Sequence, residues 1–416
     1  MNPNYILYAI PAFLLFIFIE AIIGKLKGRP LYRFNDAITN INIGIGSRVV
    51  GLFNKFVLFG AYMFFYEHFA IFNIEFSWWS FILLVVLFDF LFYWAHRLSH
   101  TINFLWAGHV VHHQSEEYNL SVALRQPWAH DLFSFIIFLP IPLLGFEPSV
   151  FLAAAAFVTI YQYWIHTRAI KKMPNWFEYI FNTPSHHRVH HGRNPKYIDR
   201  NHAGFLIIWD RLFGTFTLEE EEPSFGITTQ FTSWNPAWAN LAYYNEMWQN
   251  MKQMPQLKDK LKMIVARPGW LPDYLGGYQA PPEIDPSLKK YDKTASPILN
   301  LYILAQFLIV VWATIAFMKN FDEFVFPFHI LSASIIILTM MTCGAIFEGK
   351  KWALYAEYVK LLLAIIGLNT MYYYLFAEWL YISLIISSVV FVILNIWFTL
   401  SWVFDRNSRK ILFGNA

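Results

Sequence analysis

Residues 77–95 have the sequence SWWSFILLVVLFDFLFYWA, and the five residues that follow are HRLSH. An apolar run of about 18 or more residues predicts a membrane-spanning helix, because about 20 residues at roughly 1.5 Å each cross a hydrocarbon core of roughly 30 Å. The run carries one ionisable residue, Asp89, and leads directly into His96 and His100. The stretch therefore predicts a membrane helix that delivers imidazole side chains to the edge of the bilayer.

Comparable apolar runs recur along the chain. The stretch 132–165 is also apolar, but Pro140, Pro142, Gly145 and Pro148 interrupt it, so we expect two short spans or a hairpin that dips into the bilayer. The expected spans cover residues 5–23, 49–66, 77–95, 296–318, 326–347, 352–375 and 379–403. This pattern predicts an all-α integral membrane protein built as a multi-span helical bundle.

Composition excludes several classes of protein. Of the 416 residues, 57% are hydrophobic and 14% are charged, whereas roughly 25% are charged in an ordinary soluble domain. A water-soluble globule and a disordered chain are therefore excluded. The net charge of +3 gives no basic surface for nucleic acid. The single cysteine, Cys343, excludes an internal disulfide and thiolate metal clusters, so any metal must use nitrogen and oxygen ligands.

The distribution of basic residues predicts the orientation in the membrane. Lys25, Lys27, Arg29 and Arg33 follow the first span, whereas the loop 67–76 contains no Lys or Arg. Because basic loops remain in the cytoplasm, we expect the N-terminus outside and the C-terminus inside. The first span lacks a basic leader and a small-residue cleavage site, so we interpret it as a retained anchor.

The same orientation places two polar stretches, 96–131 and 166–295, in the cytoplasm. The second is too mixed to span a bilayer, so it predicts a helical cap, and Pro and Gly residues between 268 and 282 indicate a linker. The predicted domains are N-terminal membrane spans (1–75), a histidine-motif core with the cap (76–267), the linker (268–295) and a C-terminal four-span region (296–416).

The histidines are strongly clustered. Nine of the 14 fall in the windows 96–113 and 186–191, where random placement would put about one. Isolated histidines are usually structural or exposed, and we expect this of His68, His130, His202 and His329.

The spacing within the clusters indicates how the rings could converge. Residues three or four apart share a helix face, so His96 can act with His100. Adjacent residues such as His112 and His113 differ by about 100° around a helix, so each can serve a different ion. The simplest interpretation is that two metal ions are present, each bound by four or five imidazoles. We therefore expect the cytoplasmic cap of the helical bundle to carry a dimetal site.

Imidazole suits zinc, copper, iron and nickel. Because neutral ligands leave the charge of the ions uncompensated, carboxylates are expected nearby. Asp89 is the predicted functional carboxylate, because an ionisable residue inside a span is rarely incidental. Glu116, Glu117, Asp131 and Asp199 are weaker candidates. A purely structural zinc site is the alternative, although such sites usually close with four ligands that include Cys.

The pattern His-x3-His, His-x2-His-His, His-x2-His-His resembles the fatty acid hydroxylase and sterol desaturase superfamily, whose members are membrane enzymes with a histidine-bound di-iron centre on the cytoplasmic side. Longer stretches are similar to the alkylglycerol monooxygenase family. These stretches are WAGHVVHH (106–113), YNLSVALRQ (118–126), YWIHT (163–167), NTPSHHRVHHGRN (182–194) and GFLIIWDRLFGTF (204–216). The resemblance extends over roughly residues 30–260.

This resemblance implies a function and a set of ligands. The implied reaction is dioxygen-dependent hydroxylation of the ether-linked carbon of glyceryl ethers, which releases an aldehyde and a glycerol derivative. The implied cofactors are two iron ions, with tetrahydrobiopterin or an electron-transfer protein as reductant and a membrane lipid as substrate. By position, the implied metal ligands are His96, His100, His109, His112, His113, His166, His186, His187, His190 and His191.

Two other functions are compatible with the same residues. One is a fatty acyl, sterol or carotenoid hydroxylase or desaturase of the same superfamily. The other is a zinc-binding membrane protein without turnover, such as a scaffold or a metal transporter. A transporter predicts polar residues at mid-membrane in several spans, whereas here the clustered histidines lie outside the apolar runs.

Overall fold

The computed structural model describes residues 5–285 and 287–404. Within these residues every regular element is a helix, and extended segments meet only at isolated bridges such as Phe181 with Leu206 and Gly192 with Phe225. The predicted all-α fold is therefore confirmed.

The helices are numbered in chain order. The α-helices are α1 (Tyr5–Leu26), α2 (Phe34–Phe69), α3 (Trp78–Thr101), α4 (Asn103–His113), α5 (His130–Ser134), α6 (Pro140–Leu144), α7 (Pro148–Trp164), α8 (Asn175–Ile180), α9 (Pro184–His190), α10 (Ile208–Leu212), α11 (Pro236–Lys252), α12 (Leu257–Val265), α13 (Pro297–Lys319), α14 (Phe326–Phe347), α15 (Lys351–Leu375) and α16 (Leu380–Phe404). Short 3-10 helices are η1 (Val122–Leu124), η2 (Phe135–Phe138), η3 (Pro195–Tyr197), η4 (Asp273–Leu275), η5 (Phe321–Glu323) and η6 (Ala377–Trp379).

Seven of the described helices are long and apolar enough to cross a membrane, namely α1, α2, α3 and α13 to α16. The second differs from its prediction, because α2 begins at Phe34 rather than near residue 49. Its first half carries buried polar side chains that bind the loop after α4. Asp36 accepts a hydrogen bond from Ser115, and Asn40 donates one to Ser121. Because the first half of α2 carries these polar side chains, a search for apolar runs detects only its second half.

The interrupted stretch 132–165 folds as short pieces followed by α7, and the break falls at the predicted residues. Pro140 and Pro148 are the first residues of α6 and α7, and Gly145 turns the chain between them with φ +91°. A Cβ atom at Gly145 would lie 1.7 Å from the carbonyl oxygen of Phe72. Only glycine fits this close approach.

The chain forms two compact units. Among the described residues, unit 1 comprises 5–47, 51–231, 240–285 and 287–291, and unit 2 comprises 48–50, 232–239 and 292–404. In unit 1 the apolar core lies around α3, where Leu84 and Phe88 pack with Tyr62, Ile141 and Phe146. This core anchors the helix that carries the first two histidines of the pattern.

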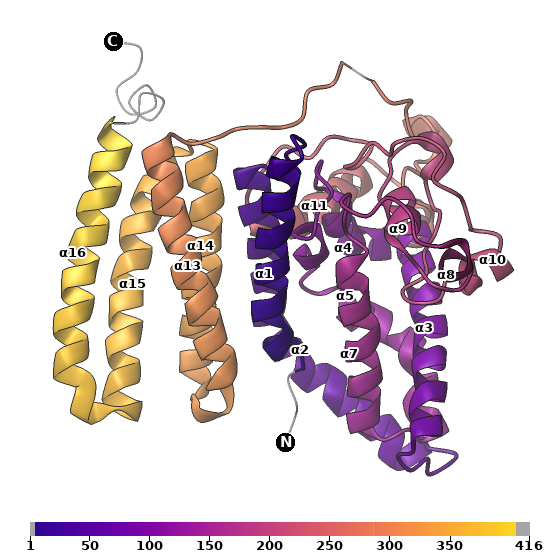
Figure 1. Ribbon diagram of the computed structural model, residues 1–416, viewed down its shortest axis with the longest axis horizontal. Coiled ribbons are helices and arrows are strands. Elements are labelled where there is room, and N and C mark those ends of the chain that lie inside the picture. The colour runs from indigo at the N-terminus through magenta and orange to yellow at the C-terminus, as the bar shows by residue number, and fades with distance from the viewer. Residues whose placement is uncertain (1–4, 286, 405–416) are drawn as a thin grey trace. The chain divides into compact units, whose positions relative to one another are not determined.

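Unit 2 contains α13 to α16, a bundle in which consecutive helices pack against each other and α13 also contacts α16 (Figure 1). Its interior includes a buried ion pair between Glu357 and Lys360 of α15. Tyr302 of α13 donates a hydrogen bond to Glu357, and Lys360 donates one of 3.0 Å to Gln306. Polar contacts thus connect α13 and α15 inside an otherwise apolar bundle.

A single residue redirects the chain at the end of α3. Ile102 is extended (φ −107°, ψ 118°), so α3 ends at Thr101 and α4 begins at Asn103. Helices α8, α9 and α10 gather near this C-terminal end of α3 (Figure 1). The histidine-bearing segments of unit 1 therefore meet where the third candidate span ends.

Candidate metal centre

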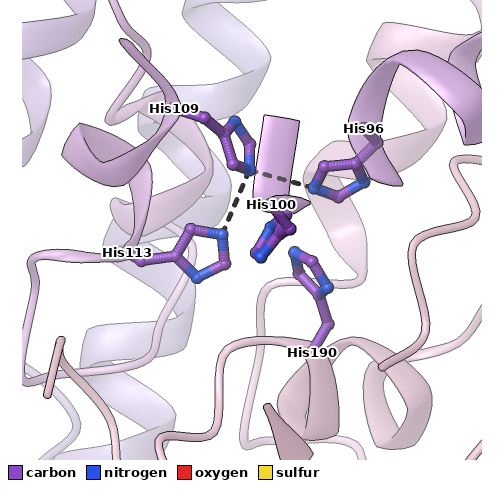
Figure 2. Close-up of side chains that lie close together, drawn as sticks. All are labelled: His96, His100, His109, His113 and His190. Atoms are coloured by element: carbon purple, nitrogen blue, oxygen red, sulfur yellow. Dashed lines mark hydrogen bonds between the residues drawn. The ribbon is translucent and has the colours of Figure 1, made fainter. Parts of the chain in front are cut away.

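Nine histidines converge in two groups that could each hold a metal ion, and the ligand nitrogens within a group lie within 4.8 Å of one another. The five-histidine group consists of His96, His100, His109, His113 and His190, and the four-histidine group consists of His112, His166, His187 and His191. All are buried except the half-buried His109. Figure 2 shows the rings of the five-histidine group turned toward a common centre.

The helical spacing of the motifs produces this division. His109 and His113, four residues apart on α4, face the five-histidine group, whereas His112 faces the four-histidine group. His187 and His191 are likewise four residues apart and share one group, while His190 belongs to the other. Adjacent histidines point to different groups because consecutive helical residues differ by about 100°.

Backbone carbonyls orient the rings. In the four-histidine group, Nδ1 of His112 donates to the carbonyl oxygen of Arg125 (2.9 Å), and Nδ1 of His166 donates to that of Gln162 (2.7 Å). A carbonyl oxygen can only accept, so each Nδ1 carries the proton and each Nε2 presents a lone pair. This is the tautomer that a metal-binding histidine needs.

The two lone pairs lie close together. Nε2 of His112 and Nε2 of His166 are 3.2 Å apart. Burial lowers the pKa of His112 to about 4, and burial followed by the neighbouring His112 lowers the pKa of His166 well below its usual value. Both rings are therefore neutral at pH 7, and their facing lone pairs repel unless a cation lies between them. The arrangement fits a bound metal ion.

The five-histidine group has the same property. Nε2 of His109 is 3.0 Å from Nε2 of His96 and 3.1 Å from Nε2 of His113 (Figure 2). A single proton on Nε2 of His109 could be donated to His96 or to His113, but not to both. The Nε2 atoms of His100 and His190 are buried and have no hydrogen-bond partner among the described residues. An all-nitrogen donor set of this kind suits iron, zinc, copper or nickel.

A loop in an unusual backbone conformation supplies two further carbonyls. Nδ1 of His96 donates to the carbonyl oxygen of His202 (2.7 Å), and Nδ1 of His190 donates to that of Arg200 (2.9 Å). Asp199 and Asn201 adopt φ of 56° and 55°, a left-handed region that asparagine and aspartate tolerate better than most residues. The conformation places both carbonyls toward the five-histidine group.

Side chains hold this loop in place. Asn201 donates hydrogen bonds to the carbonyl oxygens of Thr217 (2.8 Å) and His186 (3.1 Å). The carboxylate of Asp210 accepts from the backbone N–H groups of His202 and Ala203, both at 2.8 Å. No sequence pattern marks Asn201 or Asp210, because their role depends on segments brought together only by folding.

His186 lies outside both groups, although the resemblance implied it as a ligand. Its Nδ1 is 3.3 Å from the hydroxyl oxygen of Thr183, and its Nε2 is 4.0 Å from the carboxylate of Glu178. Burial lowers the pKa of His186 to about 4, against the opposing effect of Glu178. The structure therefore brings together nine of the ten candidate histidines and places His186 against α8.

Asp89 supports the backbone near the site rather than a ring. Its carboxylate accepts hydrogen bonds from the N–H groups of Phe205 (2.7 Å) and Leu206 (2.9 Å) and from the indole of Trp209 (2.8 Å). It thereby ties α3 to the segment that leads into α10. Among the weaker candidates, Asp199 lies 3.6 Å from Nδ1 of His100.

Glu116 and Glu117, two further candidate carboxylates, bind other segments of unit 1. Glu116 accepts a hydrogen bond from the backbone N–H of Tyr291 (2.7 Å), and Glu117 forms ion pairs with Arg33 and Lys290. They connect α4 to the start of α2 and to the linker.

Two histidines expected to be structural or exposed lie beside the five-histidine group. The ring centroid of His202 is 5.2 Å from that of His100, and neither ring nitrogen of His202 has a hydrogen-bond partner among the described residues. Ser99 donates to the carbonyl oxygen of Ala95, so Nε2 of His130 must donate to the hydroxyl oxygen of Ser99 (2.8 Å). No spacing in the sequence relates either histidine to the clusters.

Comparison with known proteins agrees with this geometry. The fatty acid hydroxylase family profile matches residues 81–215, a range that contains both histidine groups. Alkylglycerol monooxygenase from Danio rerio is 40% identical over 316 residues, which cover 74% of this chain and 70% of that protein. Its counterpart from Homo sapiens is 35% identical over 376 residues, which cover 87% of this chain and 82% of that protein.

A more distant relative matches a shorter stretch of the chain. Ornithine lipid hydroxylase from Rhizobium tropici is 32% identical over 133 residues, 32% of this chain and 40% of that protein. No solved structure matches the chain. The identity to the first two relatives extends over most of both chains, and seven helices here can cross a membrane. The chain is therefore an integral membrane protein of the alkylglycerol monooxygenase family.

Proposed function

We propose that this protein is a di-iron monooxygenase that hydroxylates the ether-linked carbon of glyceryl ethers and so releases a fatty aldehyde and a glycerol derivative. The observation that carries the proposal is the convergence of nine imidazoles in two groups, within a chain 35–40% identical to alkylglycerol monooxygenases from Danio rerio and Homo sapiens. The five-histidine group would hold one ion and the four-histidine group the other.

The proposed reaction consumes one dioxygen and one two-electron reductant for each ether cleaved. An ether R–CH2–O–R′, dioxygen, two electrons and two protons give the hemiacetal R–CH(OH)–O–R′ and one water. The hemiacetal then loses its C–O bond to give the aldehyde R–CHO and the alcohol R′–OH. A tetrahydropterin is the proposed donor of the two electrons and two protons. When bound, the iron ions would supply the dioxygen activation and C–H oxidation.

The chain itself holds and shields the reacting site. Carbonyl oxygens of Gln162, Arg125 and His202 fix ring nitrogens of His166, His112 and His96, so the opposite nitrogens are preorganised for the ions. Burial of eight of the nine rings excludes bulk water. A dry site protects a reactive oxidant from unproductive side reactions.

The position of the site suits a lipid substrate. His96 and His100 lie in the last turns of α3, a candidate membrane span. An alkyl chain can therefore approach from the bilayer while dioxygen and reductant approach from water. We place the site at the cytoplasmic boundary, with the N-terminus outside and the C-terminus inside, because basic residues cluster after α1.

The test is a reconstituted reaction. The purified full-length protein, loaded with iron, is incubated with an alkylglycerol, tetrahydrobiopterin and dioxygen, and fatty aldehyde is measured by mass spectrometry. We expect aldehyde only when all components are present, and about two iron ions per chain by metal analysis, one for each histidine group. Stoichiometric zinc with no dioxygen-dependent product would instead support a non-catalytic metal-binding protein.

The partial match to ornithine lipid hydroxylase favours one competing reaction, the hydroxylation of a lipid that is not a glyceryl ether. The same reaction mixture distinguishes the two. Hydroxylated acyl lipids with glyceryl ethers left intact would contradict the proposed substrate, whereas aldehyde release from the ether alone supports it.

A further inference from the structure

Helix α12 lies outside the candidate membrane spans, yet one of its faces exposes large apolar side chains. Leu257, Leu261 and Val265 are 69%, 56% and 65% exposed. They are spaced four residues apart, so they form one continuous stripe along the helix. An exposed aliphatic stripe on a short helix that also carries three lysines and an aspartate indicates an interaction surface.

The opposite side of α12 is already packed. Met263 is 3% exposed and contacts a small core that contains Ala107, Met247 and Met254. Around the helix, Met263 is about 160° from Leu261, at about 100° per residue. The stripe therefore points away from the core of unit 1.

Charge beside the stripe identifies its partner. Lys258 and Lys262 flank one side of the stripe and Lys260 flanks the other. Nζ of Lys262 lies 4.6 Å from the ring centroid of Trp270, whereas Lys258 and Lys260 can extend past the apolar residues toward headgroups. Residues 252–267 contain five basic residues and one acidic residue, Asp259. The carboxylate of Asp259 accepts a hydrogen bond of 2.8 Å from Tyr274. An apolar stripe between lysines is typical of helices that lie on anionic membranes.

Helix α12 also lies next to the point where a candidate span ends. The backbone N–H of Asn103 donates to the carbonyl oxygen of Ala266 (2.8 Å), and its side chain donates to that of Met263 (3.0 Å). Asn103 follows Thr101, the last residue of α3, by two positions. The C-terminal end of α12 is thus held at the level where the chain leaves the bilayer.

We propose that α12 is an in-plane membrane anchor, whose apolar stripe enters the boundary between headgroups and acyl chains and whose lysines bind anionic lipid headgroups. The proposal is independent of the reaction assigned to the histidine groups, because it concerns a surface that contains none of the nine histidines.

Fluorescence quenching in nanodiscs tests the position of the stripe. Full-length protein with Cys343→Ser receives one cysteine, at Leu257, Leu261 or Val265, and each variant is labelled with a fluorophore. The matched control carries the label at Glu222, which is exposed on the loop after α10. Lipids brominated on the acyl chain should quench labels on the stripe at least about twofold more than the control, and aqueous iodide should show the reverse order.

Charge reversal tests the lipid. Combining the Leu261→Cys label with Lys258→Glu, Lys260→Glu and Lys262→Glu should reduce bromolipid quenching in anionic nanodiscs to the level seen with zwitterionic lipid. Hydrogen exchange of the unlabelled protein provides a second measurement, with slower exchange of residues 257–265 expected in anionic nanodiscs. Iodide quenching equal to the control would overturn the proposal. So would protection from both quenchers, which would indicate a protein partner or a second copy.

Discussion

At the scale of single residues, the chemistry depends on where one proton sits on each imidazole. The Nδ1–H groups of His112 and His166 each donate a hydrogen bond to a backbone carbonyl, which leaves two Nε2 lone pairs 3.2 Å apart. Neither ring can relieve this repulsion by protonation at neutral pH, because burial keeps both pKa values low. The fold thus maintains an arrangement that is favourable only around a cation.

Replacing His112 should therefore remove one ion. For His112→Ala we expect the iron content to fall from about two to about one per chain and aldehyde formation to fall by more than the roughly 10- to 100-fold typical for loss of an outer hydrogen-bond partner. Metal analysis and the aldehyde assay measure the two effects. His68→Ala is the matched control, because His68 is exposed and bonds only within its own helix. Equal losses in both variants would refute the assignment.

Asn201 should matter without touching a metal ion. Its side chain holds the loop whose carbonyls orient His96 and His190, and its φ of 55° costs an ordinary residue about 1–2 kcal/mol. We expect Asn201→Ala to weaken iron binding roughly 10- to 100-fold. Asn201→Gly loses the same hydrogen bonds, but glycine adopts a positive φ without steric cost. The unfolding free energy of the glycine variant should therefore exceed that of the alanine variant by about 1 kcal/mol. Iron titration measures the loss of metal affinity, and chemical denaturation measures the unfolding free energy. Equal unfolding free energies for the alanine and glycine variants would argue against backbone strain at residue 201.

At the scale of secondary structure, Asp89 shows how one carboxylate organises an element. It accepts three hydrogen bonds from the segment 205–209, which lies far away in the sequence. Asp89→Ala removes the fully buried acceptor of three partly buried donors at about 1–3 kcal/mol each, so we expect more than about 3 kcal/mol of destabilisation. Thermal denaturation and faster hydrogen exchange of residues 204–212 measure the loss. Glu222→Ala, at an exposed site, should change neither.

The helices of unit 2 contain a comparable polar contact. Removing one partner of the buried pair Glu357–Lys360 leaves the other charge uncompensated, so Lys360→Met should cost roughly 3–5 kcal/mol. The double variant Glu357→Gln with Lys360→Met removes both charges and should be clearly more stable than the single variant. Unfolding of detergent-solubilised protein in increasing SDS provides the comparison. A double variant as unstable as the single one would show that the charges themselves are not the cause.

At the scale of the whole molecule, metal ions should contribute to stability, because the histidine groups connect α3, α4, the residues after α7, and α9. A ligand present at 100 times its dissociation constant stabilises the folded state by about 2.7 kcal/mol. We therefore expect chelation to lower the Tm and ferrous iron to restore it. Differential scanning fluorimetry with and without a chelator measures this. An unchanged Tm after verified iron removal would mean that the groups are preorganised without ions.

Much of this architecture can be predicted from the sequence because it depends on local periodicity. Runs such as 77–95 and 326–347 predict helices from apolar length alone, and Gly145 and Pro148 predict the break in 132–165. The division of His112 from His113 between two groups follows from the pitch of a helix. The family is likewise recognisable from short motifs, because the spacing of histidines within each motif is what lets their rings share a helix face and converge on a metal ion.

Tertiary structure alone decided the surroundings of the rings. The position of His186 against Glu178 depends on how α9 packs on α8. The positions of His202 beside His100 and of Asp89 beside residues 205–209 depend on chain segments that are distant in sequence. The carbonyls that fix each tautomer also depend on such segments, because any backbone carbonyl can accept a hydrogen bond and no residue type marks the one that does. Sequence periodicity determines which side chains share a helix face. Only the packing of separate helices determines which residues and backbone groups that face contacts.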